Sequence, residues 1–215
     1  KHLDMSLLTA KHCLVLDAGG EIGTAVIGAP HQISCTLTIH GKKAHAGIEP
    51  EKGINAIVVA ADLIRRFPVG RLDAHSVANY GSITGGGASN IVPDLVTING
   101  EIRSHDAALL DAHIKSLEQA ATDAGSASGA TIDILVTPEY AAFAVAETAP
   151  LLTMVREACT TCGLPFAAVV GGGGSDANIL ASRGLSCVNL ACGMRMVHTN
   201  EEYVVIEDLV KAAGL

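Results

Sequence analysis

The chain has 215 residues, enough for one large domain or two smaller ones. Hydrophobic residues make up 49% and charged residues 17%, so the chain can bury a core and is not a disordered segment. The formal net charge is −8 and aromatic residues make up only 3%, which argues against a nucleic-acid partner, since phosphates and bases would find few complementary side chains. The longest apolar runs are too short to cross a bilayer, so no membrane partner is expected.

The six cysteines lie among apolar residues in a chain that is too large to need disulfides. We therefore expect reduced thiols and a cytoplasmic location. Cys159 and Cys162 have the C-x-x-C spacing at the end of a periodic helix, but no second pair accompanies them. Buried helix cysteines are favoured there over a redox or zinc role.

The first part of the chain predicts a short helical segment over residues 3–10 and then a buried strand over residues 13–17. Asp17 ends this strand and glycines follow it. Open α/β sheets bind ligands at the carboxyl ends of their strands, which makes Asp17 a candidate ligand. The competing interpretation is that Asp17 caps a turn before Gly19.

The middle of the chain has the order β-α-β-β-α-β, the split βαβ or ferredoxin-like arrangement. The expected elements are strand 32–40, helix 50–67, strands 77–84 and 95–103, helix 106–125 and strand 132–136. Proline at position 50 suits the first helical residue, Asp106 suits a helix cap, and Gly125 is expected to end the second helix before a loop over 124–130. We expect the first helix to bury one stripe of residues: Ile54, Ile57, Val58, Ala61, Ile64 and Phe67.

The last part returns to an α/β pattern. We expect helix 151–162, strand 166–170, a glycine-rich loop over 171–178, a short helix, strand 186–190, a loop over 193–202 and a terminal helix from residue 206. Residues 1–31 and 139–215 are therefore predicted to form one α/β domain. Residues 32–138 are predicted to form a smaller α+β domain inserted into it.

Three features are candidates for chemistry. Loop 171–178 lacks the lysine and the glycine spacing of nucleotide-binding loops, but its backbone N–H groups suit a carboxylate or an oxyanion; alternatively, it is a turn capped by Ser175. His198, in a loop after an apolar strand, is able to bind a metal. His45 lies on a glycine-containing turn between a strand and a helix, where a histidine is either a surface residue or a functional one. No G-x-S-x-G motif supports serine hydrolysis.

Seven motifs occur in a fixed order along the whole chain: Asp17-Ala-Gly-Gly, Gly41-Lys-Lys-Ala-His-Ala-Gly-Ile, Pro50-Glu-Lys-Gly-Ile-Asn-Ala, Gly85-Gly-Gly-Ala-Ser-Asn-Ile-Val-Pro, Glu101-Ile-Arg-Ser, Gly173-Gly-Ser-Asp-Ala-Asn and Val197-His-Thr-Asn-Glu-Glu. Together they resemble the co-catalytic di-zinc metallopeptidase and amidohydrolase family of peptidase T, carboxypeptidase G, aminoacylase and succinyl-diaminopimelate desuccinylase. The peptidase T-like branch is the most similar.

The resemblance implies a role for each matching position. Asp17 is implied to be a carboxylate ligand of one zinc ion and His198 a ligand of the other. Gly174 and Ser175 match the loop that lines the substrate pocket. Arg103 matches the arginine that binds the substrate carboxylate, a role that suits its planar guanidinium.

The resemblance also implies that residues 32–138 are a lid that carries the contacts of a homodimer. His45 and Asn90 match lid residues that reach an active site, which in many members belongs to the partner subunit. The lid histidine polarises the scissile carbonyl and stabilises its oxyanion.

The chain departs from the family pattern before Asp17, because the ordered set of an H-x-D motif, a bridging aspartate and a Glu-Glu pair does not occur there. Glu201 and Glu202 follow His198 and are not that pair. Because a catalytic zinc ion takes about three protein ligands, the metal site of these residues is expected to be incomplete. We expect the 215 residues to be the C-terminal part of an enzyme and to be inactive alone.

For the full-length protein, the resemblance implies an exopeptidase that cleaves short peptides with a zinc-activated water, using two Zn²⁺ ions or other divalent metals per active site. An N-acyl-amino-acid deacylase of the same family remains an alternative. So does a non-catalytic dimerisation or sensing module, because split βαβ domains serve such roles too.

Overall fold

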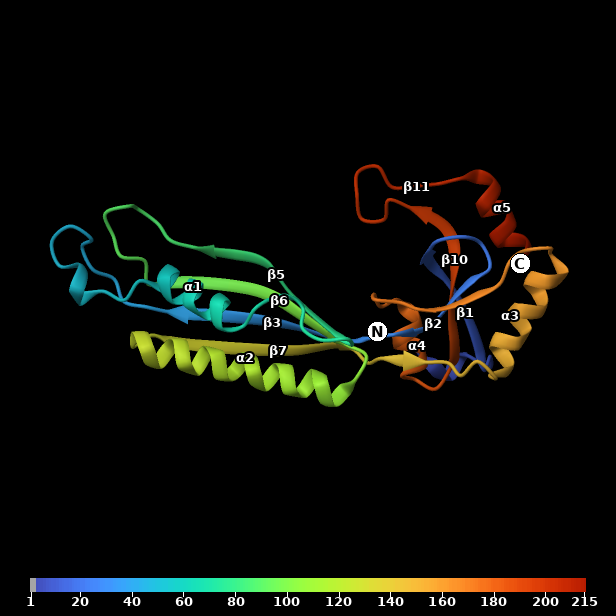
Figure 1. The fold of residues 1–215 in the computed structure, drawn as a ribbon, viewed down its shortest axis with the longest axis horizontal. Coiled ribbons are helices and arrows are strands. Elements are labelled where there is room, and N and C mark those ends of the chain that lie inside the picture. Colours follow the sequence, from blue (N-terminus) through green and yellow to red (C-terminus); the bar gives the residue numbers. More distant parts are fainter. Residues whose placement is uncertain (1–2) are drawn as a thin grey trace. The chain divides into compact units, whose positions relative to one another are not determined.

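The computed structural model describes residues 3–215, which form two compact units (Figure 1). Unit 2 is His31–Glu139, and unit 1 comprises the residues before it together with Tyr140–Leu215. Each predicted domain boundary lies one residue away from these limits.

Unit 2 contains a five-stranded sheet with the order β4-β5-β6-β3-β7. Two helices cover one face of this sheet, and their buried residues share one core with it (Figure 1). The predicted β-α-β-β-α-β order is confirmed, with the two-residue strand β4 added. The elements are β3 (His31–His40), α1 (Ala56–Arg66), β4 (Gly70–Arg71), β5 (Ser76–Gly85), β6 (Leu95–Ser104), α2 (Ala107–Ser128) and β7 (Thr131–Tyr140).

The first helix of unit 2 differs from its prediction in both start and face. Pro50 begins a separate 3₁₀ turn (Pro50–Lys52), and α1 begins only at Ala56. The side chain of Asn55 caps this helix by accepting hydrogen bonds from the backbone N–H groups of Ile57 and Val58. Ile57 and Val58 were expected inside, but they are 46% and 64% exposed. The helix residues that pack on the sheet are Ala56, Val59, Ala60 and Leu63. The predicted stripe is right in part, since Phe67 is buried in the same core and Ile54 and Ile64 pack against it.

Two predicted stops in unit 2 are also wrong. Helix α2 continues past Gly125, which is buried within it, and ends at Gly129 in the left-handed conformation with φ 74°. Asp106 does cap this helix as predicted, accepting from the backbone N–H groups of Ala108 and Leu109. Strand β7 continues past Pro138, since proline is tolerated in an edge strand.

Unit 1 contains a six-stranded sheet with the path β1-β10-β2-β8. Strand β9 pairs with β2, and β11 pairs with β10. Strands β2, β8 and β11 were not predicted, and β10 runs five residues further than expected. The elements are the 3₁₀ turn η1 (Met5–Leu7), β1 (His12–Gly19), β2 (Thr24–Ala29), β8 (Phe143–Ala144), α3 (Pro150–Thr161), β9 (Ala167–Val170), α4 (Asp176–Ala181), β10 (Ser186–Arg195), β11 (Tyr203–Val204) and α5 (Ile206–Gly214).

The strand predicted over residues 13–17 was expected to be buried. It lies at one end of the sheet path and pairs with β10, while Leu14 and Leu16 are 50% and 56% exposed. An apolar strand at a sheet edge with one uncovered face is a surface that another polypeptide segment can cover.

The six cysteines are free thiols. Cys159 is buried on α3, and burial raises the pKa of its thiol, but Cys162 is exposed, so only one of this pair is a buried helix cysteine. Within residues 3–215, no helix is both long enough and apolar enough to cross a membrane.

Candidate metal and substrate site

A cavity of about 530 Å³ in unit 1 brings together the two residues predicted to bind metal, Asp17 and His198. Neither the Asp17 carboxylate nor the His198 ring has a hydrogen-bond partner among residues 3–215. Both side chains are thus available to a ligand in the cavity. Its lining is Asp17, Ala18, Gly19, Val26, Gly171, Gly173, Gly174, Asn189, Met194, Val197, His198 and Glu202.

Asp17 lies where the pairing of β1 with β10 becomes irregular. The register is regular from His12 to Leu16, then skips Asp17 and resumes at Ala18. The side-chain amide of Asn189 on β10 fills this break: its Oδ1 accepts from the Asp17 backbone N–H at 3.0 Å, and its Nδ2 donates to the Asp17 carbonyl at 2.9 Å. Sequence reasoning missed Asn189, although a single amide in an apolar strand was a usable signal.

His198 lies on a tight turn after β10. Its backbone is in the left-handed region with φ 66°, as is that of Met196 with φ 55°. The turn is closed by Thr199, whose backbone N–H and hydroxyl both donate to the Met196 carbonyl, and by Glu202, whose carboxylate accepts from the His198 backbone N–H at 2.9 Å. This conformation is uncommon for a residue with a side chain, and outliers of this kind occur often at functional sites.

The glycine-rich loop contributes backbone rather than a side chain to the cavity. Gly173 and Gly174 line it, and a Cβ at position 174 would overlap the ring of Tyr140. Ser175 instead caps α4, where its hydroxyl accepts from the backbone N–H of Ala177 at 3.2 Å. Its hydroxyl is thus engaged in the capping interaction that was the competing interpretation of this loop.

The donor chemistry of the cavity suits a divalent metal such as zinc, which binds carboxylate and imidazole groups. Asp17 and His198 supply one of each, and Glu202 lines the same cavity. Within residues 3–215, however, no group of three or more His, Cys, Asp or Glu side chains is arranged to hold an ion. The cavity therefore fits a metal by donor type but supplies only part of a ligand set.

In unit 2, His45 lies on an exposed loop, and one nitrogen of its ring is hydrogen-bonded to the backbone of that loop. Its Nδ1 accepts from the Gly47 backbone N–H at 3.2 Å, so a neutral ring carries its hydrogen on Nε2, the other nitrogen. Asn90 lies on the neighbouring loop, and its carbonyl accepts from the Ala46 backbone N–H at 2.9 Å. The structure thus brings the loops of His45 and Asn90 together.

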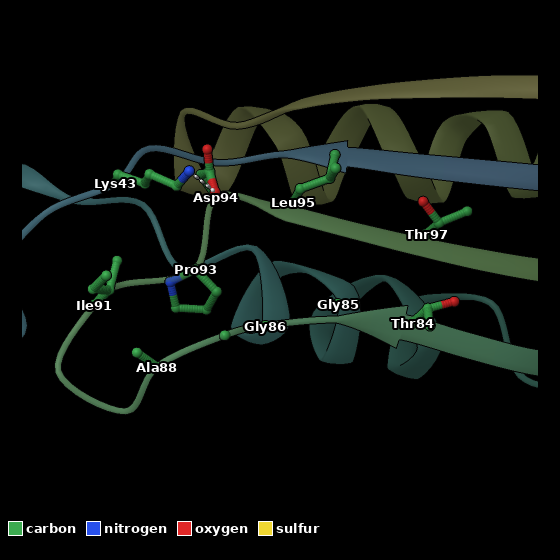
Figure 2. Close-up of a pocket in the computed structure, with 11 residues that line it drawn as sticks. Lys43, Thr84, Gly85, Gly86, Ala88, Ile91, Pro93, Asp94, Leu95 and Thr97 are labelled. Carbon is green, nitrogen blue, oxygen red and sulfur yellow. Dashed lines mark ion pairs between the residues drawn. The ribbon is translucent and has the colours of Figure 1, made fainter.

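A second cavity, of about 520 Å³, adjoins these two loops, and sequence reasoning did not predict it. Figure 2 shows Lys43 and Asp94 on one side of it, with their charged groups 3.5 Å apart. Ile91, Pro93 and Leu95 give it apolar walls, and Gly86 belongs to the loop that leads to Asn90.

Arg103 lies near the other end of β6. Its position is eight residues from Leu95, where β6 begins, which corresponds to roughly 27 Å along a strand. Its guanidinium contacts both carboxylate oxygens of Glu101, at 2.8 and 3.0 Å, and Gln32 donates to the same carboxylate. Within unit 2, Arg103 is therefore remote from the His45 and Asn90 loops.

Comparison with known proteins places this architecture in a family. Residues 27–128 match the family model described as a peptidase dimerisation domain. These residues belong to the M20 peptidase dimerisation family. Over 215 residues the chain is 38% identical to the uncharacterized protein YqjE of Bacillus subtilis (strain 168), all of this chain matching 58% of that protein.

Two solved structures resemble the chain over 99% of its length. Aminopeptidase PepT from Bacillus cereus has a TM-score of 0.89 and 37% identity, and a tripeptidase from Staphylococcus aureus has a TM-score of 0.93 and 33% identity. The chain spans 57% of each of these structures. The predicted family and α/β fold class are thus confirmed, while the chain covers a little over half of each of these relatives.

Proposed function

We propose that the protein containing this chain is a metal-dependent exopeptidase that hydrolyses short peptides. The observation that carries the proposal is the cavity of unit 1 in which Asp17 and His198 present free carboxylate and imidazole groups. Membership of a peptidase family supports it, as do the names of the two similar structures, an aminopeptidase and a tripeptidase.

Asp17 and His198 would hold zinc, or another divalent metal, at this cavity. When bound, such ions polarise a scissile carbonyl and activate a water molecule for attack. The surrounding backbone of Gly173 and Gly174 lines the space next to these ligands, where a peptide can approach closely because no side chain intervenes.

We propose that the remaining ligands and the general base of a two-metal site come from residues outside this chain. Two donors fall short of the three protein ligands that a catalytic zinc ion usually takes. The isolated 215-residue chain is therefore expected to bind zinc weakly and to hydrolyse no peptide.

His45 would donate the hydrogen of Nε2 to the oxygen of the scissile carbonyl as negative charge develops on it. Arg103 would bind the free carboxylate of the substrate, exchanging part of its pairing with Glu101 for the new partner. The separation of roughly 27 Å along β6 is too large for both residues of one chain to contact the same tripeptide, because three extended residues span about 10 Å. This separation supports a site in which His45 and Asn90 come from a partner copy.

Unit 2 offers a surface for such a homodimer. Strand β4 pairs with β5 only at Val77 and Ala78, so the rest of the outer edge of β5 has no strand beyond it among the described residues. Exposed apolar side chains lie near this edge: Ile83 on β5, and Ile57 on α1, whose side chain lies beside Gly86 in the loop after β5. An open edge with adjacent apolar groups favours pairing with a second copy.

The test is an assay of the full-length protein, freed of metal and then reloaded with zinc, against tripeptides, dipeptides and N-acyl amino acids. We expect zinc-dependent hydrolysis with tripeptides preferred. Preference for N-acyl amino acids would make the protein a deacylase instead. Absence of hydrolysis with every substrate and metal would favour a non-catalytic dimerisation or sensing module and overturn the proposal.

A further inference from the structure

We propose that Asn189 is a positioning residue that sets the direction of the Asp17 carboxylate. The inference rests on the proposed metal role of Asp17. It starts from an irregularity: Asp17 is the one residue between His12 and Gly19 that has no partner in the register of β1 with β10. Without the Asn189 side chain, the Asp17 N–H and carbonyl would lose the partners described above.

The irregularity changes which side of the strand Asp17 faces. Cys13 and Val15 are half-buried and pack against the cluster around Cys187, so regular alternation would send the side chain of residue 17 to the same face. Instead, Leu16 and Asp17 are both exposed, and Ala18 takes the buried position at 9% exposure. The bulge thus shifts the alternation by one residue and directs the carboxylate towards the cavity.

Asn189 is suited to hold this bulge because one side-chain amide offers both an acceptor and a donor. It is only 6% exposed on β10, a strand with neighbours on both sides, so its position is fixed by the sheet. An apolar residue would leave both Asp17 groups unpaired and allow the strand to return to regular alternation. Asn189 lines the cavity, but both polar atoms of its amide are engaged by the backbone of Asp17, so it acts through the ligand residue.

The test compares N189L with V188A in the full-length protein. Val188 is the adjacent β10 residue, fully buried in the core beside α3, and its truncation lowers stability without removing a hydrogen bond to Asp17. Three quantities are measured: the melting temperature of the metal-free protein, zinc affinity by competition with a chromophoric chelator, and the visible spectrum of the Co²⁺-substituted protein. N189L is expected to weaken zinc binding roughly 10–100-fold and to change the Co²⁺ spectrum, as loss of a ligand-orienting residue does.

V188A is expected to lower the melting temperature while leaving zinc affinity and the Co²⁺ spectrum as in the wild type. If N189L behaves as V188A does, Asn189 has only a structural role and the proposal is wrong. Should N189L fail to fold, N189S takes its place. Serine is smaller than asparagine, so it fits the same space, and its short hydroxyl cannot make both hydrogen bonds to Asp17.

The variant D17N distinguishes the positioning role of Asn189 from the proposed metal role of Asp17, on which it rests. Unchanged zinc affinity in D17N would refute the metal role of Asp17. If D17N binds zinc more weakly but the variants of Asn189 bind it as tightly as the wild type, only the positioning role is refuted.

Discussion

The two units hold their candidate functional residues in different ways. In unit 1, side chains fix the backbone of each proposed ligand: Asn189 bonds to Asp17, and Glu202 bonds to His198. In unit 2, His45 lies on an exposed loop that is joined to the Asn90 loop by backbone hydrogen bonds. The first arrangement suits ligands that must keep one geometry, and the second suits a donor that must reach a substrate.

This difference predicts which changes remove function and which only weaken it. A metal ion requires its ligands within a few tenths of an ångström of fixed distances. A hydrogen-bond donor to a transition state contributes to the rate without being required for binding of the metal. Changes in the unit 1 cavity are therefore expected to have the larger effects.

The largest effect is expected for D17N and H198A. Each removes one proposed ligand from the cavity, so hydrolysis should fall below detection and the bound metal per subunit should decrease. Metal analysis and peptide assays on the full-length protein measure both quantities. E201Q is the matched control, because Glu201 is exposed in the same turn and does not line the cavity. Full activity in both ligand variants would show that this cavity is not the metal site.

Replacement of His45 by alanine tests unit 2. We expect kcat to fall roughly 10²-fold or more, the effect of losing one oxyanion donor, with zinc content unchanged. Loss of zinc in H45A would contradict the assignment, because it would place His45 among the metal ligands.

A mixed dimer sharpens the comparison between the units. When H45A and D17N proteins are dissociated and reassociated together, a heterodimer pairs an intact metal cavity from the first with an intact His45 from the second. Activity above that of either variant alone would support sharing between subunits. Mixing without recovery, once exchange of subunits is demonstrated, would place His45 in the site of its own chain.

A smaller effect is expected for R103A. Loss of a charged hydrogen-bond donor costs about 1.5–3 kcal/mol, so kcat/KM for a tripeptide should fall roughly 10–100-fold, mostly through KM. The same tripeptide with a C-terminal carboxamide is the control substrate, since it lacks the carboxylate that Arg103 is proposed to bind. An equal loss on both substrates would argue for a structural role of the pair with Glu101.

The smallest effect concerns the stability of unit 2. Asp73 accepts from the His75 backbone N–H at 2.7 Å and contacts the His113 ring at 2.6 Å, which lowers the pKa of its carboxyl to about 2. Since this pKa is below its ordinary value of 3.8, Asp73 stabilises the fold above that pH, and the contribution is lost as the pH falls towards 2. The melting temperature of D73N should be slightly below that of the wild type at pH 7, and the gap should narrow below pH 4. A gap that persists unchanged at pH 2.5 would contradict this origin.

Sequence patterns predicted strands and helix caps well where the pattern was compatible with only one structure. Alternation in β3 and β6 and the cap at Asp106 are found as expected. The predicted buried face of α1 was wrong at Ile57 and Val58, because the helix has two apolar stripes. These two residues are as hydrophobic as the Val59 and Leu63 that pack on the sheet. Periodicity alone does not say which stripe meets the core.

The candidate site was predicted only in part for a related reason. Motifs identified Asp17 and His198, which line one cavity in the structure. They did not indicate a role for Asn189, which lies outside all seven motifs, or for Glu202, which ends the last motif. Bonds from these side chains to the backbone of a ligand depend on tertiary register and turn geometry. Strand β2 was missed as well, since its small residues carry little alternation.

The left-handed backbone of His198 links folding stability to activity. A side chain in this region costs about 1–2 kcal/mol relative to the ordinary conformation, whereas glycine adopts it freely. Glycine at position 198 would therefore relieve conformational strain while deleting the imidazole. A search for heat-resistant variants that ignored function would favour that exchange, so this turn is a place where thermostability and catalysis are expected to oppose each other.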